Sequence, residues 1–383
     1  MRSDTAKFAW VQGSMYMCQA VLAGYAVRYL LAAGLTNTQA GLSMALATGI
    51  SLVAQPVMTA LVDKRKMTLK QVMFLLTCVL TSLSWMLPLL RSRIWIVIAY
   101  ILISSAKSMA PAFVNAMGMT AIGNGQTINF GATRGAGSIF YGVGAQIANI
   151  LVTAWGIQTI PIFGGALALV MMISCLRFPG GEPAKKERPS GGIEFLRGNP
   201  RFTVVLVGAV LLTLGNNATG SSMYQIAAHK GNADAQGTAL LVMAWVELPV
   251  MFLFTKMLRW ERCDIWFRIS GIFMAVRLLL IWLLPGPGGF ILAQVAQMPG
   301  YGLYAISSVF YASSVVEKKD TVKAQTYMSM SGLVAGILSN VCTGVVIDTM
   351  GIEVLMALAT GIAFAGAMVI VFSAQRVERI LAK

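Results

Sequence analysis

Charged residues are scarce in this sequence, at 11% of 383 residues, whereas a soluble domain carries about 25%. Histidine occurs once, as His229, and the five cysteines lie scattered without the spacing of disulfide pairs or metal ligands. The sequence also lacks a phosphate-binding loop, a nucleophile elbow and any cluster of histidine with carboxylates. These absences exclude the usual sites of metal-dependent, nucleotide-dependent and nucleophilic enzymes, so we predict neither a cofactor nor an enzymatic activity.

Long apolar runs are abundant instead, since 57% of the residues are hydrophobic. A helix of about 20 apolar residues crosses the roughly 30 Å hydrocarbon layer of a membrane. The sequence contains twelve such runs, which predict an all-α membrane protein with twelve transmembrane helices. The predicted spans are 8–32, 37–61, 70–90, 93–117, 130–154, 157–176, 202–224, 236–258, 266–285, 287–312, 322–347 and 351–375.

One break between the runs differs from the others. The segment 177–201, RFPGGEPAKKERPSGGIEFLRGNPR, is long, polar and rich in glycine and proline, as linkers are. It separates six runs from six. We therefore predict an N-terminal six-helix bundle over 1–176, a cytoplasmic linker over 177–201 and a C-terminal six-helix bundle over 202–383.

Two short patterns recur at nearly the same separation. Pro56-Val57-Met58 and Pro249-Val250-Met251 are 193 residues apart, and a charged cluster closes each run. Trp155-Gly156-Ile157 and Met350-Gly351-Ile352 follow apolar runs and are 195 residues apart. Repeated bundles joined by a linker are typical of secondary transporters, whose substrate sites lie near the middle of the membrane.

Lysine and arginine gather in every second loop, and such loops face the cytoplasm. The net charge of +15 follows from this arrangement, so it does not call for a nucleic-acid partner. We expect a multi-pass protein of the cytoplasmic (inner) membrane with both termini in the cytoplasm. The positive loop residues are Lys64, Arg65, Lys66, Lys70, Arg177, Lys185, Lys186, Arg188, Arg197, Arg201, Arg259, Arg262, Lys318, Lys319 and Lys323.

Few charged residues lie well inside the predicted spans, and the ones of interest here are Lys107, Arg134, Glu247 and Arg277. Each costs about 2.5–3.5 kcal/mol on insertion scales, so such residues commonly face a cavity or a partner. Glu247 is the only carboxylate deep within a span, which makes it the leading candidate for a proton carrier, with Arg277 as its partner. The alternatives for Glu247 are a structural Glu–Arg pair or a side chain that snorkels toward water, and the alternative for Arg277 is a packing charge satisfied by helix carbonyls.

The fifth run carries a polar face and a small-residue face. Arg134, Ser138 and Tyr141 follow one another at helical spacing, which suits a polar solute with an apolar side. The alternative is that Arg134 anchors the membrane interface and Tyr141 faces lipid. Gly131 and Gly135 form a G-x-x-x-G pattern, continued by Gly137, Gly142 and Gly144, that lets helices approach closely. Asn115 and Asn217 are further polar points in the fourth and seventh runs.

Several of these stretches together resemble the lactose-permease-like, oligosaccharide:proton symporter branch of the major facilitator superfamily, with its nucleoside and phenylpropionate permease relatives. They are QPVMTALVDKRK, APAFVNAM, FGATRGAGSIFYGVG, VEL and MAVRLLL, in the order in which the family has them. The resemblance implies two six-helix bundles and transport by alternating access. It further implies that Arg134 binds substrate, Tyr141 stacks on it, Glu247 lies at the sugar site, Arg277 tunes proton affinity and Asp63 takes part in gating.

The chain also departs from this branch. Asn115 or its neighbour Val114 stands where the family has an acid, and the histidine and acid of the tenth span are missing, with Gln297 near that region. Neutral residues around Asn217 replace the aspartates of the seventh span, and Lys107 has no counterpart. Galactoside specificity is therefore not implied, and proton coupling depends mainly on Glu247.

We predict a monomeric secondary transporter whose partners are a small solute, protons and the lipid bilayer. Substrate-binding candidates are Arg134, Tyr141, Ser138, Glu247, Asn115, Asn217 and Lys107; Glu247 and Arg277 are candidates for proton coupling. Lys107 and Arg134 together favour an anionic substrate. As a hypothesis, charged Glu247 pairs with Arg134 from the other half until protonation or substrate releases the pair. The alternative function is a proton-driven exporter of drugs or metabolites.

Overall fold

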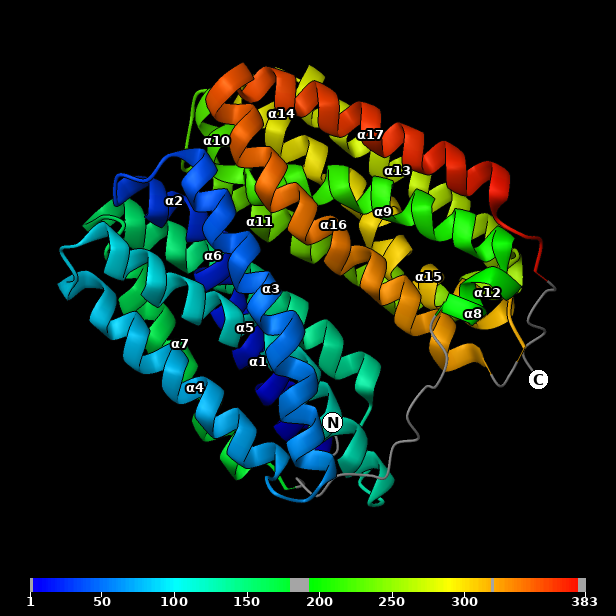
Figure 1. Ribbon diagram of the computed structural model, residues 1–383, viewed down its shortest axis with the longest axis horizontal. Coiled ribbons are helices and arrows are strands. Elements are labelled where there is room, and N and C mark those ends of the chain that lie inside the picture. Colours follow the sequence, from blue (N-terminus) through cyan, green and yellow to red (C-terminus); the bar gives the residue numbers. More distant parts are fainter. Residues whose placement is uncertain (1–2, 180–192, 318–319, 378–383) are drawn as a thin grey trace. The chain divides into compact units, whose positions relative to one another are not determined.

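The computed structural model describes residues 3–179, 193–317 and 320–377, and every regular element in these ranges is a helix (Figure 1). By contacts between their Cα positions the chain separates into two compact units, which we call unit 1 and unit 2. Unit 1 comprises Met1–Glu187 and Gln236–Trp245, and unit 2 comprises Arg188–Ala235 and Val246–Lys383. Most of the predicted linker, 177–201, lies outside the described residues.

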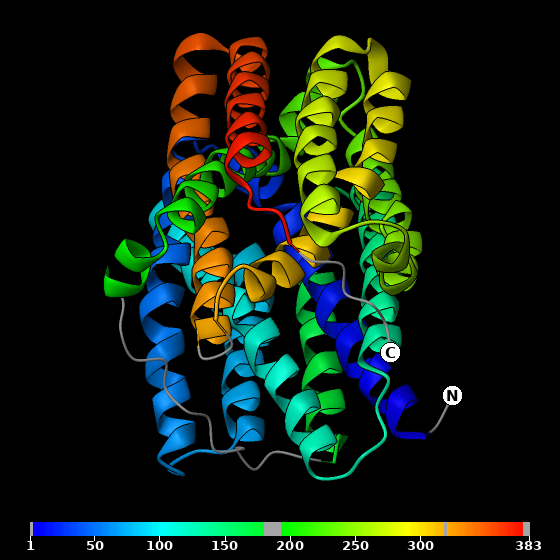
Figure 2. The same cartoon turned by 90° about the vertical axis from the view of Figure 1, so that its right-hand side faces the viewer.

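Unit 1 contains long helices that run side by side in both views (Figures 1 and 2). Its elements are α1 (Ser3–Gly24), α2 (Ala26–Ala32), α3 (Asn37–Asp63), α4 (Leu69–Met86), η1 (Leu87–Leu89), α5 (Arg93–Gly123), α6 (Phe130–Trp155) and α7 (Thr159–Arg177). Most of α11 (Ala235–Val246) also belongs to this unit.

Unit 2 begins with the short helix α8 (Ile193–Gly198) and contains more broken helices than unit 1. Its further elements are α9 (Pro200–Ser221), α10 (Met223–His229), α12 (Leu248–Trp260), α13 (Cys263–Leu283), α14 (Gly286–Ala293), η2 (Gln294–Gln297), η3 (Met298–Gly302), α15 (Leu303–Ser314), α16 (Thr321–Met350) and α17 (Ile352–Ser373).

The prediction of an all-α, multi-pass membrane fold is confirmed. Ten of the described helices are long and apolar enough to cross a membrane, one of them the stretch Ala235–Phe254, which joins α11 to the first part of α12. The two other predicted spans are each divided between consecutive helices: 8–32 falls on α1 and α2, and 287–312 falls on the series from α14 to α15. Breaks of this kind are tolerated at membrane depth where the freed backbone groups are buried in protein.

Small residues bring α1 and α6 together in unit 1. A Cβ built on Gly137 would clash with the ring of Tyr16, and one on Gly144 would lie 2.6 Å from the Cγ of Met17. Gly131 does not take part, because a Cβ there would meet only the Asn129 side chain at 3.6 Å. The small-residue face of the fifth run is therefore used for close packing, and Gly137 and Gly144, further along the helix than Gly131, make these contacts.

In unit 2, α9 and α17 approach one another in the same way. A Cβ on Gly366 would clash with the backbone of Leu212, and one on Gly215 would clash with the carbonyl oxygen of Ala359. Gly208 adds a contact with the carbonyl oxygen of Gly366, at 3.0 Å from a built Cβ. In a membrane the attraction between helices comes from such close packing, because lipid chains are as apolar as leucine.

The repeated glycines at the ends of α6 and α16 adopt nearly the same backbone conformation. Gly156 has φ 84° and ψ 173°, and Gly351 has φ 88° and ψ 170°. This region of backbone space is essentially restricted to glycine. Both glycines end their helices directly after the residues named in the sequence repeat, Trp155 and Met350. The short repeat thus marks equivalent helix ends in the two halves of the sequence.

Replacing Gly156 tests this role. Gly156→Ala should lower the free energy of unfolding by about 1–3 kcal/mol, because alanine is strained at this φ and ψ. Nothing lies within 4 Å of a Cβ built there, so backbone strain is the only cost. Gly49→Ala is the control: it lies inside α3, also with open space, and should raise stability by about 0.5–1 kcal/mol. Thermal unfolding of the detergent-solubilised protein measures both, and equal effects would contradict the assignment.

Candidate functional site

Arg134 and Ser138 lie next to one another on α6, near Tyr16 of α1. The guanidinium of Arg134 lies over the ring of Tyr16, with its Cζ 4.3 Å from the ring centroid. Its Nη1 donates to the Oγ of Ser138 at 3.4 Å, one turn along the same helix. Arg134 is half-buried and Ser138 is buried. A cation stacked on an aromatic ring is held in place while its remaining donors stay available.

A second pair from α1 and α5 continues this polar surface. Gln12 is fully buried and donates from its Nε2 to the Oδ1 of Asn115 at 2.9 Å. The Oε1 of Gln12 has no hydrogen-bond partner among the described residues. Since Gln12 and Tyr16 are one helical turn apart, α1 links Asn115 to Arg134. Gln12 and Tyr16 were not predicted, although their spacing in an apolar run is a signal that could have identified them.

Lys107 lies on α5, two turns before Asn115 and on the same side of the helix. It is half-buried, forms no hydrogen bond or ion pair with a described residue, and is close enough to Cys18 of α1 to interact electrostatically. Tyr141 is also half-buried and follows Ser138 on α6. Arg134 and Lys107 therefore lie on α6 and α5, two helices that pack against α1.

Glu247 lies in unit 2, where the helix breaks between α11 and α12. Pro249 follows within the first turn of α12 and cannot donate the backbone hydrogen bond of a continuous helix. The Glu247 side chain is buried, with 8% of the residue exposed, and its Oε1 accepts a hydrogen bond of 2.7 Å from Nε2 of Gln297. A Cβ built on Gly302 would lie 3.1 Å from the Cγ of Glu247, so Gly302 packs tightly against this side chain.

Arg277 is the largest fully buried side chain in the described chain, with 1% exposed. Its Nη2 and Nε donate to the Oε1 of Gln294 at 2.6 and 3.2 Å, and its Nη1 donates to the Oδ1 of Asn216 at 2.9 Å. Arg277 is also close enough to Glu247 to interact electrostatically. The structure thus brings Glu247 and Arg277 near one another, and amide side chains form hydrogen bonds with both of them.

The backbone of the tenth span explains how both glutamines reach these charges. Gln294 and Gln297 lie in η2, a 3₁₀ turn, and three residues per turn place them on one side. The following π-helical turn η3 contains Gly300 with φ −85° and ψ −107°, which no helix adopts. A Cβ on Gly300 would lie 3.2 Å from the backbone of Met274, so α13 passes close to this irregular segment. Gln294 was not predicted, because its role depends on this local change of helix type.

Two further candidates take no part in the hydrogen bonds described above. Asn217 donates from its Nδ2 to the carbonyl oxygen of Gly332 at 3.5 Å, toward α16, whereas its neighbour Asn216 contacts Arg277. Asp63 is exposed at the last position of α3, two residues before Arg65, which has a positive φ of 55°.

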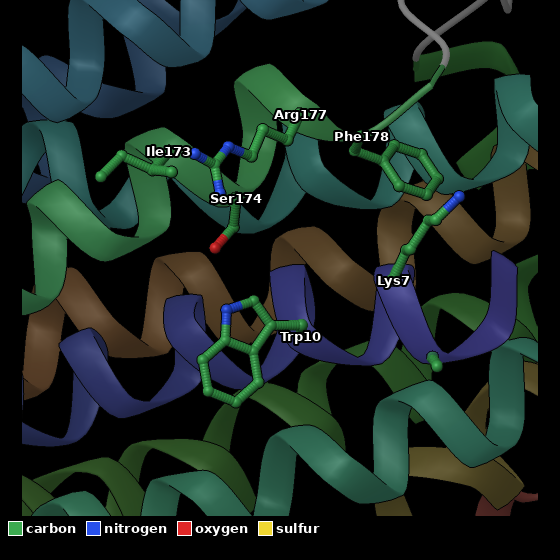
Figure 3. A pocket seen from close by; sticks show the side chains of 7 residues that line it. Lys7, Trp10, Ile173, Ser174, Arg177 and Phe178 are labelled. Atoms are coloured by element: carbon green, nitrogen blue, oxygen red, sulfur yellow. The ribbon is translucent and has the colours of Figure 1, made fainter. Parts of the chain in front are cut away.

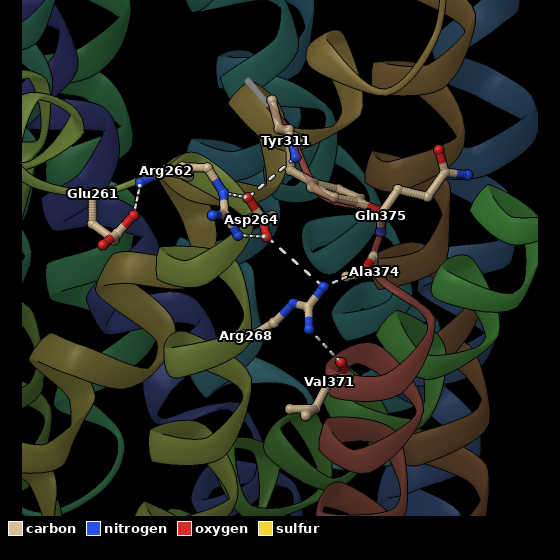
Figure 4. A network of polar contacts seen from close by, with 9 residues as sticks. Glu261, Arg262, Asp264, Arg268, Tyr311, Val371, Ala374 and Gln375 are labelled. Carbon is tan, nitrogen blue, oxygen red and sulfur yellow. Dashed lines mark hydrogen bonds and ion pairs between the residues drawn. The ribbon is translucent and has the colours of Figure 1, made fainter. Parts of the chain in front are cut away.

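Another charged cluster in unit 2 was also missed (Figure 4). Asp264 is fully buried, accepts hydrogen bonds of 3.0 and 3.2 Å from Arg262, and lies 3.7 Å from Arg268. Its Oδ1 also accepts from the backbone N–H of Val377 at 3.2 Å. The hydrogen bonds with Asp264 raise the pKa of Arg262, which keeps it charged.

The same cluster secures the end of α17. Arg268 donates to the carbonyl oxygens of Val371, at 2.9 Å, and Ala374. Tyr311 of α15 accepts from the backbone N–H of Gln375 at 3.0 Å. The sequence predicts Arg262 only as one of the positive loop residues that indicate orientation in the membrane. It does not reveal that the neighbouring aspartate is buried.

Comparison with known proteins gives a family and a fold. A family model described as MFS_1 like family matches residues 15–354. No curated protein matches the sequence. Among solved structures, the nucleoside transporter NupG is 14% identical with a TM-score of 0.82 and covers 98% of this chain and 100% of its own. An auto-inhibited POT family peptide transporter is 11% identical with a TM-score of 0.74, covering 99% and 98%.

A bacterial homologue of the human lysosomal transporter Spinster is more distant in shape. It is 12% identical with a TM-score of 0.63 and covers 98% of this chain and 96% of its own. At such low identity these structures establish the fold alone. The chain therefore has the fold of major facilitator superfamily transporters, in agreement with the resemblance seen in its sequence.

The partners of Arg277 can be tested by removing one of them. Gln294→Leu takes away the oxygen that accepts two of its hydrogen bonds, and bonds to charged groups contribute about 1.5–3 kcal/mol each. We expect the free energy of unfolding in detergent to fall by at least that amount. Gln55→Leu is the control, because Gln55 is half-buried and its side chain bonds to no described residue. If both variants unfold alike, Gln294 does not support Arg277.

Proposed function

Because the chain belongs to the MFS_1 like family, we propose that it is a secondary active transporter that moves a small polar or amphiphilic solute by proton-coupled symport. The family makes it a membrane transporter rather than an enzyme. The solute classes that we propose are sugars, nucleosides and organic acids. Nucleosides are supported by the similarity to a nucleoside transporter, and peptides are a further class to screen because of the POT family match.

One observation supports proton coupling above all others: a carboxylate is buried beside a guanidinium, and both are held by amide groups. A charge at membrane depth costs about 2.5–3.5 kcal/mol, and a proton on Glu247 removes this cost. Arg277 and Gln297 favour the charged form of Glu247 when they lie close to it. A movement that changes these distances therefore changes how readily Glu247 takes up a proton, which couples protonation to conformation.

We propose that the polar surface of unit 1 binds the solute. Arg134 supplies charged donors, Ser138 and Asn115 supply hydrogen-bonding groups, and Tyr16 holds Arg134 in place. Lys107 adds a second cation without a hydrogen-bonding partner in the described chain. We propose Tyr141 and Asn217 as further solute-binding residues and Asp63 as a gating residue. The positive charges of Arg134 and Lys107 favour a carboxylate or an acidic sugar over a neutral solute.

We further propose that the protein is a monomer of the inner membrane with both termini in the cytoplasm. The distribution of lysine and arginine supports this orientation. Symport is preferred to export because the unit 1 surface offers specific, directional donors, whereas an exporter of varied compounds needs no close fit to one solute.

The role of Glu247 predicts a split between two transport assays. In proteoliposomes with an imposed inward proton gradient, Glu247→Gln should lose at least tenfold in solute accumulation, because glutamine cannot carry a proton. Counterflow of solute, which needs no net proton movement, should persist.

Glu353→Gln is the matched control for this assay. Glu353 is an exposed carboxylate that pairs with His229 at 2.9 Å, so its loss should leave both assays unchanged. Normal accumulation by Glu247→Gln would remove the proposed role. Solute efflux driven by inward protons in the unmodified protein would instead favour the exporter.

The charge of the solute can be tested by ligand stabilisation. In a thermal-shift screen of the purified protein, carboxylates and acidic sugars should stabilise it more than neutral sugars and nucleosides do. Arg134→Gln should weaken the apparent affinity for the stabilising anion about tenfold or more, since a hydrogen bond to a charged group contributes about 1.5–3 kcal/mol. Arg259→Gln removes an exposed arginine of unit 2 and should have no effect. Stabilisation by neutral solutes alone would contradict an anionic substrate.

A further inference from the structure

A groove lies between α1 and α7 on unit 1, apart from the polar surface described above (Figure 3). Its volume is about 440 Å³, within the range of roughly 300–1,000 Å³ that is common for small-ligand sites. It is open on one side, and mostly apolar atoms line it. The lining residues are Ala6, Lys7, Trp10, Ile173, Ser174, Arg177 and Phe178.

Two cations border this groove, one from each helix. Lys7 lies in the second turn of α1 and Arg177 is the last residue of α7. Both are exposed, and neither forms a hydrogen bond or an ion pair with a described residue. Lys70 of the neighbouring α4 differs, because it donates to the carbonyl oxygen of Leu176 at 3.2 Å. The groove therefore presents two positive charges that the described structure does not neutralise.

The rest of the groove is apolar and outward-facing. Trp10 is 53% exposed, although its ring packs in a T-shaped arrangement with that of Phe140, with ring centroids 5.5 Å apart. Ile173 is 40% exposed, and in Figure 3 its side chain lies on α7 beside the guanidinium of Arg177. Ser174 uses its hydroxyl proton to bond the carbonyl oxygen of Val170 at 2.7 Å. An exposed tryptophan and isoleucine next to charged residues are typical of the level where acyl chains meet headgroups.

The position along the helices agrees with this level. Lys7 is near the start of α1 and Arg177 is at the end of α7, so the groove is at one end of the helices rather than halfway along them. The topology proposed above assigns this end to the cytoplasmic face, where anionic lipids gather and basic grooves between helices bind their headgroups.

We propose that this groove is a binding site for one anionic phospholipid of the surrounding leaflet. Its phosphate and acidic headgroup lie between Lys7 and Arg177, and its acyl chains run along Trp10 and Ile173. Charge complementarity selects the anionic headgroup, while the open, apolar wall selects a lipid rather than a soluble anion. The proposal concerns unit 1 alone and is independent of the transported solute.

Trp10 supplies a local probe for the experiment. The protein is reconstituted into vesicles that contain phosphatidylglycerol and phosphatidylcholine, with brominated acyl chains on one lipid or the other. Bromine quenches a tryptophan that it touches, and subtracting the signal of Trp10→Phe isolates the share of Trp10 among the eight tryptophans. We expect brominated phosphatidylglycerol to be preferred at Trp10 by roughly fivefold for each cation near the surface.

Paired charge-removing variants decide the origin of that preference. Lys7→Gln combined with Arg177→Gln should reduce it to about one. Arg201→Gln combined with Arg259→Gln removes two exposed cations outside the groove and should leave it unchanged. The proposal would be overturned if both double variants preferred phosphatidylglycerol at Trp10 equally. It would also be overturned if the unmodified protein showed no preference for phosphatidylglycerol there. Glycerol 3-phosphate in the aqueous phase is the last arm: if it abolishes the preference, the groove binds a soluble phosphate and not a lipid.

Discussion

Two buried charges in unit 2 need hydrogen-bonding partners, and this need determines much of the local helix geometry around them. Glu247 and Arg277 are both almost fully buried, and neither charge is stable there without hydrogen-bonding partners. Gln297 bonds the carboxylate, while Gln294 and Asn216 bond the guanidinium. Amides suit this task because they can bond charged and neutral states of a carboxyl group alike. The network can therefore persist while Glu247 gains or loses a proton.

This requirement also accounts for the broken helices. A regular helix would turn residues three apart to somewhat different directions, whereas the 3₁₀ turn η2 aligns Gln294 with Gln297. The irregular turn at Gly300 then lets the chain pass close to α13, which carries Arg277. Glycine at 300 and 302 suits this close packing, because a Cβ there would lie 3.2 Å from the backbone of Met274 or 3.1 Å from the side chain of Glu247. Local departures from regular structure thus coincide with the residues proposed to couple protons to transport.

Much of the fold could be predicted from the sequence, and part of the site could not. Long apolar runs specify membrane helices directly, and the repeated glycines at 156 and 351 identified equivalent helix ends. Arg134 and Ser138 could be placed on one face from the sequence because they share one helix, where spacing fixes the geometry. Tyr16, Gln12 and Gln294 escaped prediction because their partners come from other helices or from a change of helix type. The burial of Asp264 was missed for the same reason.

The central claim is that Glu247 changes protonation state inside unit 2. Infrared difference spectroscopy of the reconstituted protein during a pH titration measures this most directly, since a protonated carboxyl group in an apolar setting has its own carbonyl band. We expect this carbonyl band in the unmodified protein, and we expect it to shift when solute binds. The band should be lost in Glu247→Gln. A band that persists unchanged in that variant would assign the proton to another group and contradict the account.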